Sequence, residues 1–136
     1  MVNILILKLT LQMRDVGQGM NIIIEKLKKE PFVVAITRSY GLAPYLRSDV
    51  YYDGMFADTV KVDGKSVVVI VKFADKEAQS VFQPKLEEGE WLTNNALEDG
   101  FRPAVITRQL MNKLGWSEAI GKRLYLAGRT LTIVGI

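Results

Sequence analysis

Apolar and polar positions alternate most clearly in the last third of the chain, residues 103–136. The β-branched run at residues 103–106 predicts a strand, and Leu110, Met111 and Leu114 fall on one face of a helix that Thr107 can cap. Gly115 stands where such a helix ends in a left-handed residue. Alternation on both sides of a turn at residues 127–129 then predicts a hairpin.

The first forty residues carry an earlier strand–helix–strand pattern. Residues 3–11 are apolar on both faces, which is typical of a buried strand. A helix is predicted from Gly19 to about residue 29, where Pro31 ends it, and residues 32–38 are rich in Val and Ile. The apolar face of this helix consists of Met20, Ile23, Ile24 and Leu27. We therefore expect a β-α-β unit, whose strands are usually parallel.

The middle of the chain predicts mainly β structure. Asp63-Gly64 between two apolar runs is a strong signal for a hairpin, because a type I′ turn needs positive φ angles at both central residues. A short helix at residues 76–82 follows, with Asp75 as its N-cap and Pro84 as its limit, and then a polar loop at 94–100. We expect an α+β fold with one unit from residues 1–41 and 100–136 and a smaller β-rich unit, residues 42–99, inserted into it.

Composition excludes several classes of function. The chain has 136 residues, of which 49% are hydrophobic and 24% charged, as in one globular domain. Its net charge is +3, and the basic residues are scattered rather than gathered in a stripe with aromatics, so we expect no nucleic-acid partner. Cysteine and histidine are absent, which excludes disulfides, thiol nucleophiles and a Ser-His-Asp triad. We expect no catalytic residue, no cofactor and no metal site.

No segment of the sequence is long enough to cross a membrane. The longest purely apolar run is residues 67–71, far below the roughly 18 residues that a spanning helix requires. The first residues do not have the pattern of a signal peptide. The chain stops within an apolar strand, TIVGI, so we expect it to be part of a longer protein.

Two glycine patterns superficially resemble phosphate loops. Gly17-Gln18-Gly19 precedes a predicted helix, but Ile22 replaces the third glycine, so a flexible turn is favoured. Gly115 and Gly121-Lys122 have the wrong spacing, and Arg123 replaces the Mg²⁺-binding hydroxyl. We therefore expect no bound nucleotide.

Two groups of side chains are candidate sites. Glu87, Glu88 and Glu90 form the densest acidic cluster of the sequence. Two of these carboxylates could act as acid and base only if an apolar pocket made their pKa values differ. They flank Gly89 in a predicted turn, so a solvated loop without catalytic function is favoured. The second group is mainly aromatic, and such residues are enriched at protein interfaces, so it is a candidate for contact with a partner. The alternative is that these side chains fill a core between the two predicted units. Its candidate contact residues are Tyr45, Tyr51, Tyr52, Met55 and Phe56.

The last third of the chain resembles the C-terminal part of the MacB-like periplasmic core domain, found in MacB/FtsX-type ABC transporter permeases. A second match is residues 86–92, which resemble the family's "l.eGRwl" element, with Glu90 where an Arg is common. The matching residues of the last third are Ala104-Val105-Ile106, Leu110, Leu114-Gly115-Trp116, Ala119-Ile120-Gly121-Lys122, Leu124, Leu126, Gly128 and residues 131–136.

The resemblance implies a porter-like β-α-β subdomain with a smaller inserted subdomain, on the extracytoplasmic (periplasmic) side of the bacterial inner membrane. It implies a non-enzymatic domain that projects between the first two membrane helices of the permease and couples their motion to export. Implied partners are a second permease copy, a cytoplasmic ATPase acting indirectly, and exported cargo or an envelope protein. Contact with the membrane would be made only by segments outside this chain.

An alternative of another class stays open. A small soluble α+β enzyme or ligand-binding domain could use a carboxylate or a Lys. This alternative requires Glu87, Glu88 or Lys122 to lie in a dry cleft.

Overall fold

The computed structural model of the protein describes residues 16–37, 39–40, 56–126 and 128–136. The chain divides into two compact units, Met1–Ile36 and Thr37–Ile136. Both helices and sheets are present, so the predicted α+β class is confirmed. None of the helices in the described parts of the chain is both long and apolar enough to cross a membrane.

The first unit contains helix α1, Val16–Leu27. Its predicted apolar face is confirmed, because Ile24 is buried while Met20, Ile23 and Leu27 are half-buried. The helix begins three residues earlier than predicted, so Gly17-Gln18-Gly19 lies in its first turn and the interpretation as a flexible turn was wrong. In the sequence Val16 stands four residues before Met20, a helical spacing that is consistent with the early start.

The strand predicted over residues 32–38 is not formed by residues 32–37. These residues are irregular, and the side chains of Phe32 and Val34 are 77% and 99% exposed. A β-branched run becomes a strand only beside a hydrogen-bonding neighbour, and no strand among the described residues pairs with this one. Residues 3–11 lie outside the described residues, so the N-terminal β-α-β unit and the porter-like arrangement stay predictions.

The second unit contains the predicted hairpin. Strands β2 (Phe56–Val62) and β3 (Lys65–Val71) pair antiparallel in an unbroken register from Phe56↔Val71 to Val62↔Lys65. Asp63 and Gly64 have φ angles of 49° and 76°, the positive values on which the prediction rested.

Short elements continue the chain beyond the hairpin. Strand β4 (Phe73–Ala74) pairs antiparallel with β1 (Ser39–Tyr40). Helix α2 covers Ala78–Phe82, and Asp75 Oδ1 accepts a hydrogen bond from the Ala78 N–H at 3.1 Å. Asp75 therefore holds the turn that leads into α2, and the helix proper begins two residues later than predicted.

The last third of the chain forms a three-stranded sheet and one helix. Strands β5 (Arg102–Val105), β6 (Arg123–Leu126) and β7 (Arg129–Gly135) are arranged in the order β5-β7-β6, and β5 runs parallel to β7. Helix α3 (Arg108–Lys113) connects β5 to the hairpin of β6 and β7. The predicted strand, helix and hairpin are thus confirmed.

Helix α3 has the predicted cap at its N-terminus and the predicted left-handed glycine after its C-terminus. Thr107 Oγ1 accepts a hydrogen bond from the Leu110 N–H at 3.2 Å. At the other end Gly115 has a φ of 71°, and the Trp116 N–H reaches the Met111 carbonyl at 3.1 Å, a Schellman arrangement. The cap and the stop therefore fix the length of α3.

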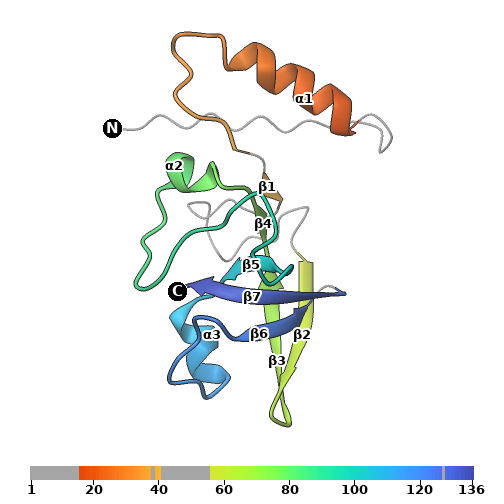
Figure 1. The fold of residues 1–136 in the computed structure, drawn as a ribbon, viewed down its shortest axis with the longest axis vertical. Coiled ribbons are helices and arrows are strands. Elements are labelled where there is room, and N and C mark those ends of the chain that lie inside the picture. Colours follow the sequence, from red (N-terminus) through yellow and green to blue (C-terminus); the bar gives the residue numbers. More distant parts are fainter. Residues whose placement is uncertain (1–15, 38, 41–55, 127) are drawn as a thin grey trace. The chain divides into compact units, whose positions relative to one another are not determined.

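One hydrophobic core joins the hairpin to the sheet and to α3. Val60 of β2 is 1% exposed and Ile133 of β7 is 0% exposed. Figure 1 shows β6 and β7 crossing the β2–β3 hairpin, whose inward residues Val67 and Val69 pack against this core while Val68 points outward. The buried members of the core are Val60, Ile106, Met111, Leu114, Ala119, Leu124, Ile133 and Ile136.

The cap of α3 yields a stability prediction. Thr107→Ala removes the acceptor of the Leu110 N–H and should lower the free energy of unfolding by about 1 kcal/mol. Thr107→Ser retains the hydroxyl and is the matched control. Urea unfolding of the two variants checks this, and equal losses from both would show that the hydroxyl does not act as a cap.

Candidate functional site

Two segments far apart in the sequence meet at the end of β7, where residues 86–92 run alongside the strand. The N–H of Glu87 donates to the Ile136 carbonyl at 2.7 Å, and the Ile136 N–H donates to the Glu88 carbonyl at 3.0 Å. The Glu90 N–H reaches the Val134 carbonyl at 2.8 Å, and Gly89 bridges Gly135 in antiparallel fashion. Residues 86–92 thus continue the sheet by backbone contact, and we call this set of contacts the β7 joint.

The β7 joint requires a glycine on both sides. A Cβ at Gly89 would lie 2.1 Å from the Val134 carbonyl oxygen, and a Cβ at Gly135 would lie 2.3 Å from the Glu90 carbonyl oxygen. Both distances are far below van der Waals contact with backbone atoms. Gly89 also has a φ of 77°, which side chains disfavour. The close approach of the two backbones is therefore possible only because neither residue has a side chain.

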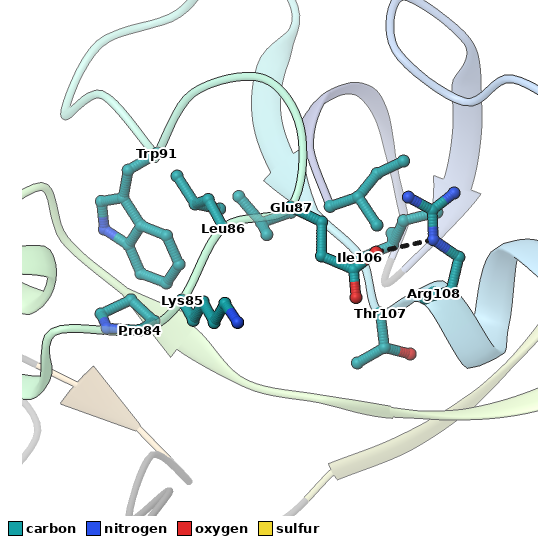
Figure 2. A pocket seen from close by; sticks show the side chains of 10 residues that line it. Pro84, Lys85, Leu86, Glu87, Trp91, Ile106, Thr107 and Arg108 are labelled. Carbon is teal, nitrogen blue, oxygen red and sulfur yellow. Dashed lines mark hydrogen bonds and ion pairs between the residues drawn. The ribbon is translucent and has the colours of Figure 1, made fainter.

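Arg108, the first residue of α3, binds the same segment through its side chain. Its Nε lies 2.8 Å from Glu87 Oε2 and its Nη2 lies 2.8 Å from Glu88 Oε1. Its Nη1 contacts Met111 Sδ at 3.3 Å. Figure 2 shows the Arg108 side chain reaching from α3 to Glu87. All three guanidinium nitrogens thus have partners, so the side chain is held in one orientation.

A shallow pocket of about 300 Å³ lies beside the β7 joint, where the parallel strands β5 and β7 end. Its floor is mainly apolar, with Leu86, Trp91 and Ile106 pointing toward it in Figure 2. Trp91 Nε1 donates to the Asp75 carbonyl at 3.2 Å, which fixes one wall. The lining consists of Pro84, Lys85, Leu86, Glu87, Trp91, Val105, Ile106, Thr107, Arg108 and Ile136.

Several polar side chains that line this pocket hold segments of the chain together. The hydroxyl of Thr107 is engaged in the cap of α3, and Glu87 is engaged by Arg108. The carboxylates of Glu88 and Glu87 raise the pKa of Arg108, so its charge is fixed at every accessible pH. Thr107, Glu87 and Arg108 therefore stabilise the structure and are already paired.

A second network binds the middle of β7. Asp99 Oδ1 accepts from the Phe101 N–H at 2.9 Å, and Asp99 Oδ2 accepts from the Thr132 hydroxyl at 2.8 Å. The backbone N–H of Phe101, then the Thr132 hydroxyl and the charge of Arg123, hold the pKa of Asp99 below its usual value. The Arg123 guanidinium also lies over the Phe101 ring, 4.5 Å from its centroid. The loop that carries Asp99 is thereby tied to β6 and β7.

The sequence candidates are placed in very different ways. Glu87 and Glu88 are 53% and 52% exposed and paired with Arg108, while Glu90 is exposed and contributes its backbone to the β7 joint. Lys122 is exposed, with its Nζ 4.7 Å from the centroid of the Trp116 ring. The solvated-loop interpretation of the acidic cluster holds only in part, because two of its members bind Arg108.

The aromatic candidates are not tested by the structure. Tyr45, Tyr51, Tyr52 and Met55 lie outside the described residues, and the side chain of Phe56 at the start of β2 is likewise not described. Within the described residues, no group of acidic side chains is arranged to hold a metal ion.

Neither the role of Arg108 nor the pairing of Gly89 with Gly135 was predicted from the sequence. Arg108 stands one residue after a cap and has no motif around it. The charge of residues 86–92 could have indicated that a cation binds them, because this segment contains three carboxylates and no cation. Such a segment docks on a structured domain most readily where a cation meets it.

Fold and site together define an α+β domain whose described polar clusters hold segments together and do not converge in a dry cleft. A comparison with protein families then names the class. The profile of the MacB-like periplasmic core domain matches residues 13–136, and the chain belongs to this family. It is an extracytoplasmic domain of a MacB/FtsX-like ABC transporter permease, on the periplasmic side of the bacterial inner membrane. Searches of curated proteins and of solved structures returned no significant match.

Gly89 of the β7 joint yields a stability prediction, with Gly121 outside the joint as the control. Gly89→Ala adds both backbone strain and a clash, whereas Gly121→Ala adds strain alone, because Gly121 has a φ of 85° and nothing within 4 Å. Overpacking costs about 1–3 kcal/mol beyond the strain. Urea unfolding should therefore show a clearly larger loss for Gly89→Ala, and equal losses would contradict the close backbone contact.

The Asp99 network predicts a dependence of stability on pH. Because the pKa of Asp99 is lower in the folded chain than in the unfolded chain, its contribution is present above the unfolded pKa and is lost as pH falls through the folded pKa. Unfolding measured from pH 6 down to about pH 3 should show a shallower acid loss in Asp99→Asn than in the original chain. Identical acid slopes in the two proteins would rule out this network as the cause.

Proposed function

We propose that this domain is a non-enzymatic coupling module, which passes conformational change between the membrane helices of its permease and an exported cargo or envelope partner. The observation that carries the proposal is the family match over residues 13–136. In this family the domain lies between the first two membrane helices of the permease, so it moves with them if its ends are firmly attached to its core.

The β7 joint supports this proposal in physical terms. Strand β7 contributes Ile133 to the core, and the residues after it are held by backbone hydrogen bonds to residues 87–90. Displacement of either of these two segments therefore reaches the core through paired backbone. Stiff transmission of this kind is what a coupling module requires, and it needs no reactive group.

The proposed partners follow from the transporter context. A second permease copy would stand beside the first, and the cytoplasmic ATPase would act indirectly through the membrane helices. We propose the aromatic set Tyr45, Tyr51, Tyr52, Met55 and Phe56 as the contact for cargo or for the second copy.

The enzyme alternative lacks support from the residues on which it depended. Glu87 and Glu88 are half exposed and paired with Arg108, and Lys122 is exposed. None of the three lies in the dry cleft that would separate pKa values for acid–base chemistry. The coupling function is therefore favoured.

Coupling can be tested by distance measurement in the full-length transporter with its ATPase. The chain has no cysteine, so a spin label at Lys113→Cys on α3 is specific within this domain. We expect the distance between the labels of the two copies to differ between the nucleotide-free and ATP-trapped states. An unchanged distance in the two states would contradict coupling.

A label pair within one copy serves as the control. Lys61 on β2 and Lys113 on α3 are both exposed, on elements that share one core. The distance between labels at these two positions, with an unlabelled second copy, should be the same in both nucleotide states. A change there would mean that the domain deforms internally.

A further inference from the structure

We infer that the outward face of the β2–β3 hairpin is a docking surface for a partner protein, which binds it through a segment whose apolar side chains are flanked by carboxylates. We call this face the outer row; it consists of Ala57, Thr59, Val68 and Ile70. The inference rests on the proposed function in taking the partner to be an exported cargo or an envelope protein.

Strand β3 is apolar on both of its faces, although one of them is exposed. Val67 and Val69 pack against the core, whereas Val68 and Ile70, which alternate with them, are 71% and 60% exposed. An antiparallel strand with one solvated face usually has polar residues on that face, and apolar residues on both faces are typical of a strand that is covered on both sides. The outward side chains of β3 thus have the composition of a buried surface.

The residues of β2 leave these side chains open to a partner. In the register of the hairpin Thr59 lies opposite Val68 and Ala57 lies opposite Ile70, and both residues of β2 are exposed. Directly opposite residues of an antiparallel pair share one face of the sheet. Because Thr and Ala are small, no long polar side chain at these two positions shields Val68 or Ile70.

Exposed lysines stand near both ends of the outer row. Lys61 of β2 lies toward the turn, and Lys72 directly follows β3. The carboxylates nearest in the sequence of the hairpin are Asp58, which lies opposite the inward residue Val69, and Asp63 in the turn, so neither lies in the row between the lysines. A partner that covers the row therefore meets positive charge near both of its ends, and carboxylates complement that charge.

The same features decide between possible occupants. In a twofold pair of these faces each row would meet an identical one, so lysines would stand opposite lysines whichever way the strands run, which lowers affinity. A lipid surface is disfavoured by the composition of the row, which has no Trp or Tyr, the residues that anchor proteins at a membrane interface. A different protein with an acidic, apolar segment is therefore favoured.

The test uses the full-length transporter with its ATPase and two fluorescent peptides. In the acidic peptide, ESVTVSE, two valines lie between two glutamates on one face of an extended strand; the basic peptide, KSVTVSK, is its matched control. Fluorescence anisotropy at low salt should show about tenfold tighter binding of the acidic peptide, because two charge pairs replace two repulsions. High salt should reduce this difference.

Variants of the outer row assign the binding to it. Val68→Thr combined with Ile70→Thr should weaken binding of the acidic peptide at least about tenfold, because it removes apolar area and keeps β-branched side chains in the strand. Lys61→Gln combined with Lys72→Gln should remove the preference for the acidic peptide. Tyr125→Ser changes an exposed side chain of β6 and should bind as the original does.

The outcomes separate this inference from the coupling function. The docking surface is wrong if the acidic peptide does not bind, if both peptides bind equally, or if the variant with both Thr substitutions binds fully; a nucleotide-dependent distance between copies would then still support coupling. If the peptide binds as expected and that distance is unchanged, the surface stands and coupling fails.

A spin label at Val68→Cys tests the other occupants in the same transporter. Water around this label, and no contact with its counterpart in the second copy, is the result expected for a free docking surface. A label in contact with its counterpart, or one that lies among lipid acyl chains, would show a different occupant and would overturn the inference.

Discussion

Direct backbone contact between Gly89 and Gly135 determines how residues 86–92 pack against β7. Two peptide segments far apart in the sequence approach so closely that a methyl group on either glycine would overlap a carbonyl oxygen. The hydrogen bonds of residues 87–90 to residues 134–136 form only at that separation. Since the segment at 86–92 also carries Trp91, whose indole binds the Asp75 carbonyl, the same contact places one wall of the adjoining pocket.

Ion pairs add to the backbone contacts that hold residues 86–92. The docked segment has only carboxylates, and the cation that neutralises two of them comes from α3. The position of α3 depends in turn on the Thr107 cap and on burial of Met111 and Leu114 in the core shared with β7. The core and the cap thus position the cation, and residues 86–92 are bound both to β7 and to α3.

The sequence predicted those parts of the fold whose cause is local. Asp63-Gly64, Thr107 and Gly115 determine the backbone within a few residues of themselves, and each predicted turn or cap was found. The strand expected at residues 32–38 depends on a partner strand, and among the described residues none pairs with residues 32–37. Gly89 and Gly135 are separated by more than forty residues, so no local sequence pattern could predict their pairing. The role of Arg108 is a tertiary contact of the same kind, so only its charge, and not its partner, was visible in the sequence.

Residue 90 is a position at which this chain differs from the family's element, and the geometry of the site shows where the positive charge comes from instead. Where Glu90 stands, the family's element commonly has an arginine, so in this chain the segment lacks a cation of its own. Glu90 uses its backbone to bind Val134, and its side chain is exposed. The positive charge is supplied from outside the segment by Arg108, so the two ion pairs join residues 86–92 to the first residue of α3.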